Sequence, residues 1–166
     1  MTKARTETPR PYVITKAIDR DDDAVIQQAI AILHRRLHAG YEDVLASPGT
    51  VRDFLSLRLA GEEAEAFWCV FLTAQNRVID ARELFRGTIT QTAVYPREIV
   101  KAVLACNAHG VIFAHNHPSG IAEPSRADEL LTQQLRQALA TIDVRVLDHF
   151  VVAGPNYCSF AERGLL

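Results

Sequence analysis

The chain has 166 residues, of which 48% are hydrophobic and 23% are charged, and its formal net charge at pH 7 is −2. This composition is typical of one globular domain with a substantial buried core. It excludes a large basic excess, which would supply the phosphate contacts of a strong nucleic-acid binder, although a local basic patch is compatible with a near-neutral total.

The N-terminal sequence and the cysteines indicate the cellular setting. Residues 1–16 are polar, contain prolines and lack the apolar segment of a signal peptide, and no apolar run downstream is long enough to span a bilayer. The cysteines are odd in number and scattered among apolar neighbours, which predicts reduced core side chains at Cys69, Cys106 and Cys158. We therefore expect a cytoplasmic protein.

Residues 19–40 predict an amphipathic helix with an acidic first turn, basic residues near its end and Gly40 as its stop. Its apolar stripe consists of Val25, Ile26, Ala29, Ile30, Leu33 and Leu37. His34 and His38 have a zinc-binding spacing, but the segment between them lacks the glutamate of a zinc protease and carries arginines that repel cations. A solvated helix end is the favoured interpretation of this pair.

A second helix and a buried strand follow. Residues 47–61 predict a helix with Ser47 as N-cap, Pro48 in the first position and Gly61 beyond the end. The continuous apolar segment from Phe67 to Thr73 predicts a strand that is covered on both faces.

The rest of the chain alternates between strands and helices. The expected elements are meander strands at 77–85 and 87–94, a helix at 95–108, a strand at 110–117, a helix at 124–142 and a strand at 144–154. Pro96 suits the first turn of the helix at 95–108. Together these patterns predict an α/β fold in which helices sandwich one mixed sheet.

The segment HNHPSGIAEPSRAD, from His115 to Asp128, carries the strongest chemical signal. Alternate side chains of a strand point to the same face, so His115 and His117 can reach one ion from the strand's end. The turn at residues 118–120 reverses the chain, and Asp128 then falls in the first turn of the next helix, where it can face the histidines. Two imidazoles, one carboxylate and an open fourth position are the ligand set of a catalytic zinc site, which makes hydrolysis the natural inference.

A simpler interpretation needs no metal. Ser125 and Asp128 have the spacing of a capping box, which stabilises the start of any helix. The histidine pair favours the metal, because two imidazoles at a strand end are costly to leave without partners in an apolar setting. The spacing alone leaves both interpretations open.

The pattern His-X-His, seven residues, Ser, two residues, Asp resembles the JAMM motif of MPN-domain metalloproteases. The segments VYPREIVKAVLACNAHGVIFAHNHPSG and RVLDHFVVAG…YCSFAERG are similar to the RadC family, and the resemblance covers roughly Ser47 to Leu166. It implies a JAB/MPN domain, related in fold to the cytidine deaminases, in residues 47–166, after a polar tail and helix in residues 1–46. Full-length RadC proteins carry a further helix-hairpin-helix region, so this chain resembles the short RadC-like proteins.

The resemblance also implies a function. Zn²⁺ would be bound by His115, His117 and Asp128, and Ser125 would stabilise an oxyanion. The implied activity is that of a JAMM-type zinc hydrolase that cleaves a peptide or isopeptide bond with a metal-activated water. The alternative is a non-catalytic zinc-containing module with an accessory role in DNA repair or replication. The expected partner is a peptide or protein substrate, without strong nucleic-acid binding and without a membrane, and a homo-oligomer is compatible with the sequence.

Two further clusters extend this site. The family pattern has a glutamate ahead of the first apolar strand, which acts as a general base; Glu65 is the expected residue, although Glu62, Glu63 and Glu65 could all simply solvate a loop. Asp148 and His149 belong to the family-like segment LDHF. One of them could support a metal ligand, and a satisfied polar pair within a strand is an equally good interpretation.

Overall fold

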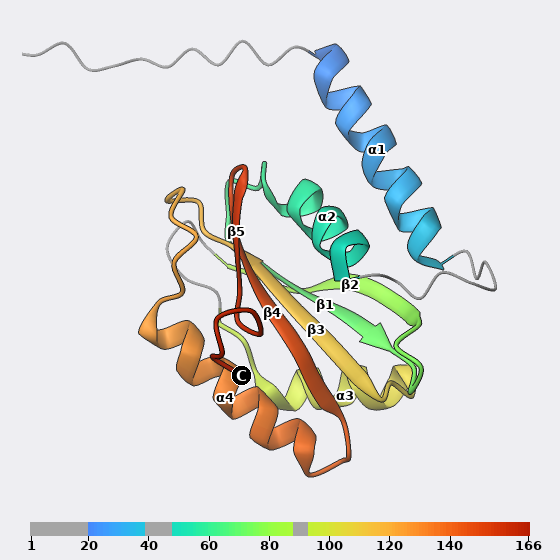
Figure 1. Cartoon of the computed structure of the whole chain (residues 1–166), viewed down its shortest axis with the longest axis vertical. Coiled ribbons are helices and arrows are strands. Elements are labelled where there is room, and N and C mark those ends of the chain that lie inside the picture. Colours follow the sequence, from blue (N-terminus) through green and yellow to red (C-terminus); the bar gives the residue numbers. More distant parts are fainter. Residues whose placement is uncertain (1–19, 39–47, 88–92) are drawn as a thin grey trace, which may run out of the picture.

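The computed structural model describes residues 20–38, 48–87 and 93–166. Within these ranges the chain forms four helices and five strands (Figure 1). The helices are α1 (Arg20–His38), α2 (Pro48–Leu59), α3 (Pro96–Cys106) and α4 (Arg126–Ala140). The strands are β1 (Ala66–Leu72), β2 (Val78–Arg86), β3 (Gly110–Asn116), β4 (Arg145–Ala153) and β5 (Asn156–Ser159).

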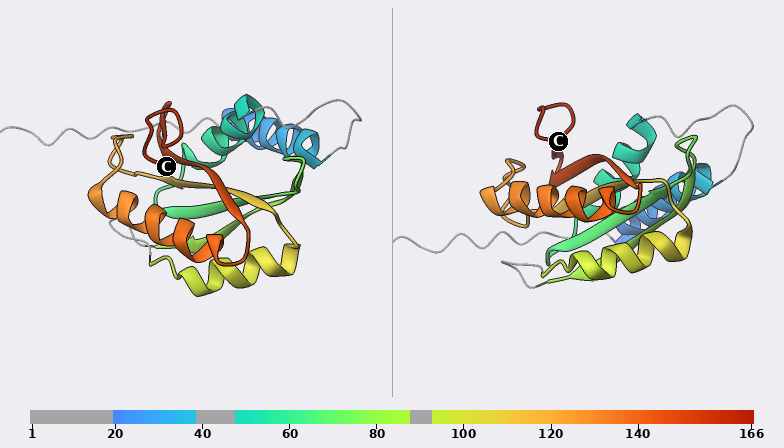
Figure 2. Two further views of the ribbon diagram at one scale, coloured as in Figure 1. Left: turned by 60° about the horizontal axis from the view of Figure 1, so that its bottom comes forward. Right: turned by 90° about the horizontal axis from the view of Figure 1, so that it is seen from below.

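The strands form one mixed sheet in the order β2-β1-β3-β4-β5. Strands β3 and β4 are parallel, and the other neighbouring pairs are antiparallel. Helix α4 makes the crossover that joins the two parallel strands. Helices α1 and α2 lie on one side of the sheet, and α3 and α4 lie on the other (Figure 2). The predicted α/β fold with a sandwiched mixed sheet is confirmed.

Side-chain alternation along the strands divides the core into two layers. On β3, Ile112 and Ala114 belong to the layer that α2 covers, whereas Val111 and Phe113 belong to the layer covered by α3 and α4. The same alternation brings the side chain of His115 to the α4 side of the sheet. Strand β1 is buried along its whole length, as its apolar sequence predicts, because it lies between β2 and β3 and is covered on both faces.

Helix α1 forms where predicted, but only part of its apolar stripe is buried. Ile30 and Leu33 pack against the layer that α2 covers. Val25 and Ile26 are 64% and 42% exposed. The N-terminal end of α1 extends away from the sheet (Figure 1). The side chain of Leu37, like Gly40 and Ser47, lies outside the described residues. The division of the chain at residue 46 stays a prediction.

The histidines of α1 are partly described. His34 is exposed, as expected of a solvated helix end, and its ring lies 5.8 Å from the ring of Phe54. The side chain of His38 lies outside the described residues, so the zinc-binding spacing of this pair stays untested.

Strand β5 was not predicted from the sequence, and most of the predicted strand at 87–94 lies outside the described residues. Strand β5 pairs with β4 through the two-residue loop Gly154–Pro155, in which Gly154 has a φ of 57° that suits a tight hairpin. Of the predicted strand at 87–94, residues 88–92 lie outside the described residues, and Gly87, Ala93 and Val94 are not in a strand.

The cysteines have the predicted state. All three are free, with Cys69 and Cys158 buried and Cys106 half-buried. No helix among the described residues combines the length and hydropathy that a bilayer crossing requires.

Candidate metal centre

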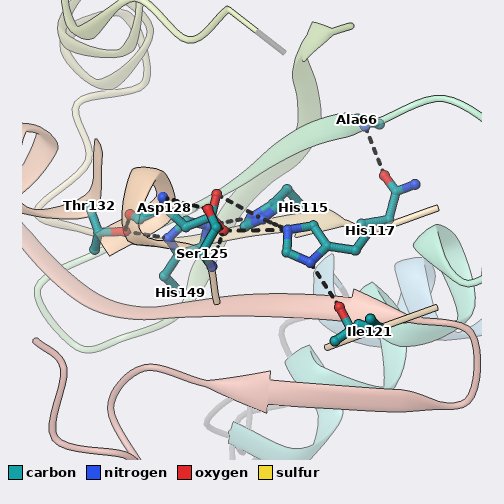
Figure 3. A network of polar contacts seen from close by, with 9 residues as sticks. Ala66, His115, His117, Ile121, Ser125, Asp128, Thr132 and His149 are labelled. Atoms are coloured by element: carbon teal, nitrogen blue, oxygen red, sulfur yellow. Dashed lines mark hydrogen bonds and ion pairs between the residues drawn. The ribbon is translucent and has the colours of Figure 1, made fainter. Parts of the chain in front are cut away.

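The candidate site lies at the end of β3, where His115 is part of the strand and His117 follows it. The backbone N–H of His117 donates to the carbonyl of Val152 at 2.8 Å, which extends the pairing with β4 and holds the histidine close to extended geometry. The Nε2 atoms of His115 and His117 are 3.0 Å apart. The two imidazoles therefore point to the same place, as the alternation of an extended chain predicts (Figure 3).

Asp128 faces this pair from the first turn of α4. Its Oδ1 lies 3.4 Å from Nε2 of His115, and its Oδ2 lies 3.4 Å from Nε2 of His117. One ligand atom from each of the three residues lies within 4.8 Å of the others, a spacing at which the group could hold a metal ion. The structure thus brings together the three predicted ligands from two different elements.

The same aspartate also caps α4, so the two interpretations of the motif are compatible. The hydroxyl of Ser125 accepts from the backbone N–H of Asp128 at 3.2 Å, and the Asp128 carboxylate accepts from the N–H of Ser125 at 2.7 Å. The Ser125 hydroxyl also donates to Oδ2 of Asp128 at 2.6 Å. This capping box fixes the first turn of the helix. The cap thereby orients the carboxylate toward the histidines.

The electrostatics of the site favour a charged carboxylate. Burial raises the pKa of the Asp128 carboxyl, but contacts with the rings of His115 and His117 outweigh burial and hold this pKa well below its usual range. The hydrogen bond with Asp128 raises the pKa of His117 above its ordinary value. The site is therefore built around a carboxylate that stays ionised beside two imidazoles.

Glu65 lies just ahead of β1, which is antiparallel to β3. The paired register of the two strands ends at Phe67, which is opposite His115, so Glu65 lies two residues beyond the last pair. Its carboxyl is half-buried, and burial raises its pKa, which also responds to the charges of His115, Asp128 and His117. The predicted base thus lies within electrostatic reach of the three predicted ligands.

The two neighbouring glutamates have different surroundings. The Glu62 carboxylate forms ion pairs with Arg58 and Arg86. The Glu63 side chain is exposed. The Glu65 carboxyl, by contrast, interacts with the charges of the two histidines and Asp128.

Asn116, between the two histidines, is a site residue that the sequence analysis missed. Its side chain points to the other face of the sheet, where its Oδ1 accepts from the N–H of Ala66 at 2.8 Å. Its Nδ2 donates to the carbonyls of Glu62 and Ala64 at 3.2 and 3.0 Å. One buried amide therefore ties the segment that carries Glu65 to the strand that carries the histidines. The asparagine in HNHP was the available signal, but nothing local to it reveals the distant partner.

We expect Asn116→Ala to destabilise the metal-free protein by about 1–3 kcal/mol, because it leaves the buried N–H of Ala66 without its acceptor. Denaturant unfolding of the metal-free protein measures this change. Asn156→Ala is the control, since Asn156 is exposed at the start of β5. Equal unfolding midpoints for the two variants would contradict the role of the Asn116 amide.

In the LDHF segment, Asp148 and His149 have different structural roles. Asp148 accepts from the Ser159 hydroxyl at 2.6 Å and from the N–H of Ala161 at 3.0 Å, and so anchors the C-terminal turn. His149 is fully buried, and its Nε2 lies 2.9 Å from Nδ1 of His115. Asp148 is thus a satisfied structural group, whereas His149 contacts a predicted ligand.

The donor set suits a metal such as zinc. Nδ1 of His117 lies 2.9 Å from the carbonyl oxygen of Ile121, which can only accept, so Nδ1 carries a hydrogen and, in the neutral ring, Nε2 carries the lone pair that can bind a metal ion. Two imidazole nitrogens and one carboxylate oxygen leave a position for water or substrate. Among the residues that the structure describes, this group fits a metal ion.

The fold and the histidine–aspartate group define a JAB-type domain. Residues 45–165 match the RadC-like JAB domain family, and the chain belongs to this family. It is similar to the UPF0758 protein of Thiobacillus denitrificans, with 59% identity over 143 residues that make up 86% of this chain and 63% of that protein. The UPF0758 protein of Dechloromonas aromatica is 64% identical over 125 residues, which cover 75% of this chain and 55% of that protein. The chain thus spans less than two thirds of the length of these relatives.

Proposed function

We propose that the protein is a zinc-dependent hydrolase of the JAMM type that cleaves a peptide or isopeptide bond. The observation that carries the proposal is the convergence of His115, His117 and Asp128, with the half-buried Glu65 within electrostatic reach of all three. The family supports a metal-binding hydrolase in general terms. That the metal is zinc and that the bond cleaved is an amide are proposals that go beyond the family match.

The proposed ligands are Nε2 of His115, Nε2 of His117 and a carboxylate oxygen of Asp128. When bound, the metal supplies Lewis acidity, which activates water and polarises a carbonyl group. The half-buried Glu65 accepts the proton from the attacking water and later returns it to the leaving amine; its raised pKa suits both tasks. The Ser125 hydroxyl, which donates to Asp128 in this structure, is the donor assigned to the developing oxyanion. Such a donor contributes roughly 3 kcal/mol when it is preorganised.

A polypeptide substrate suits the surroundings of the site. Ile121, whose carbonyl oxygen lies 2.9 Å from Nδ1 of His117, is 64% exposed. An exposed apolar side chain beside a polar centre favours contact with a partner that has apolar side chains of its own. We accordingly propose a peptide or protein as the substrate.

The test is cleavage of a peptide library and of isopeptide-linked conjugates by the intact chain. The zinc-loaded protein should cleave a member of the panel, and the chelator-treated protein should regain that activity when zinc is restored. Cleavage that persists without metal would contradict the proposal. A chain that binds zinc but cleaves nothing in the panel would favour the non-catalytic module with a role in DNA transactions.

Weak DNA binding is a further expected result. Because the net charge is −2, affinity for duplex DNA at physiological salt should be no tighter than the non-specific range of about 10⁻⁴ to 10⁻⁶ M. A fluorescence anisotropy titration with labelled duplex measures this affinity. A nanomolar dissociation constant would contradict the prediction and support the DNA-associated alternative.

A further inference from the structure

Three buried side chains connect α4 to the first histidine of the site. The Thr132 hydroxyl lies 2.6 Å from the backbone carbonyl oxygen of Asp128 and 2.7 Å from Nδ1 of His149. Nε2 of His149 lies 2.9 Å from Nδ1 of His115. Thr132, His149 and His115 are each at most 1% exposed, so these contacts are made without competition from bulk water (Figure 3).

The backbone carbonyl of Asp128 fixes the direction of all three hydrogen bonds. The carbonyl of Asp128 can only accept, so the single hydroxyl hydrogen of Thr132 is donated to it. The Thr132 oxygen must then accept from His149, which places a hydrogen on Nδ1 of that ring. The ring of His149 is fully buried and its hydrogen-bond partners are Thr132 and His115, neither of them a carboxylate, so the ring is neutral and its Nε2 is an acceptor. His115 therefore donates from Nδ1.

This direction leaves the lone pair of His115 on Nε2. His117 also carries its lone pair on Nε2, because its Nδ1 donates to the carbonyl of Ile121. The two Nε2 atoms are 3.0 Å apart, so in the neutral rings two lone pairs face each other. A bound cation relieves this repulsion, and the Asp128 carboxylate beside the two rings favours a cation there.

We propose that Thr132 and His149 are positioning residues that hold His115 in the tautomer whose Nε2 binds the metal. This inference rests on the proposed function, because it assigns a task to residues around the same metal. Helix α4 then orients two of the proposed ligands. Its first turn orients the Asp128 carboxylate, and Thr132, one turn later, orients His115 through His149.

The first measurement is zinc affinity, determined by competition with a chromophoric chelator. Thr132→Val keeps the shape of the side chain but removes the hydroxyl, and we expect it to weaken zinc binding about 10- to 100-fold, the usual effect of losing a group that orients a ligand. Thr132→Ser keeps the hydroxyl and should restore affinity to within about threefold of wild type. Circular dichroism establishes that each variant is folded before it is titrated.

The second measurement uses the zinc-loaded wild type alone, so it does not depend on how the variants fold. Long-range ¹H–¹⁵N spectra of the histidine rings should show hydrogens on Nδ1 of both His149 and His115. A hydrogen on Nε2 of His149 would overturn the inference, and so would equal affinities of the valine and serine variants. Failure of the wild type to bind zinc would instead overturn the proposed function.

Discussion

Glu65→Gln is expected to leave zinc binding and the fold unchanged and to lower the rate of amide hydrolysis by about 10²- to 10⁴-fold, the usual contribution of a positioned acid–base group. Glutamine has the shape of glutamate, but it cannot take a proton from water at neutral pH. Glu65 is not among the proposed ligands, so the metal should remain. The measurement compares single-substrate rates and zinc content of the wild type and the variant.

The neighbouring glutamates provide matched controls for this experiment. Glu63→Gln changes an exposed side chain and should have no effect on rate. Glu62→Gln weakens ion pairs with Arg58 and Arg86, and its effect should appear in stability while the rate per folded molecule is kept. Equal rates for wild type and Glu65→Gln would remove Glu65 from the mechanism.

His117→Ala is expected to abolish tight zinc binding and, with it, the stabilisation that zinc confers on the fold. A ligand that binds only the folded state stabilises it by about 2.7 kcal/mol when its free concentration is 100 times the dissociation constant. Zinc should therefore raise the unfolding temperature of the wild type, and this rise should be absent in the variant. Differential scanning calorimetry with and without zinc measures both effects.

His109→Ala is the control, because it removes an exposed imidazole next to the start of β3, at the far end of the strand from the site. This variant should keep the full response to zinc. An equal zinc-induced rise in the His117→Ala variant would show that the metal binds elsewhere.

The fold and the three proposed ligands could be predicted because their signals are local. Strand β1 is a continuous apolar segment that the structure buries on both faces, and Pro96 opens α3 as its sequence indicates. His115 and His117 share a face through the two-residue period of extended chain, and Asp128 follows after a short reversal. Each of these features depends on residues close together in the sequence.

The parts that escaped prediction depend on contacts between distant segments. Asn116 bonds to backbone groups about 50 residues earlier in the chain, and His149 meets His115 only because β4 lies beside β3. Glu65 was predicted from the family pattern, because its location near the histidines depends on the register of β1 on β3, which the hydrophobic pattern alone does not fix. Strand β5, with four residues, is too short to produce a clear alternating pattern.

Zinc-edge X-ray absorption of the intact chain, purified without chelator and measured together with its metal content, tests the proposed metal centre most directly. The proposed site predicts about one zinc per chain, bound by two imidazole nitrogens and by oxygen ligands at about 2.0–2.2 Å, without sulfur. A chain that contains no zinc and takes none up when zinc is added would contradict it, as would a zinc ion bound by cysteine sulfur.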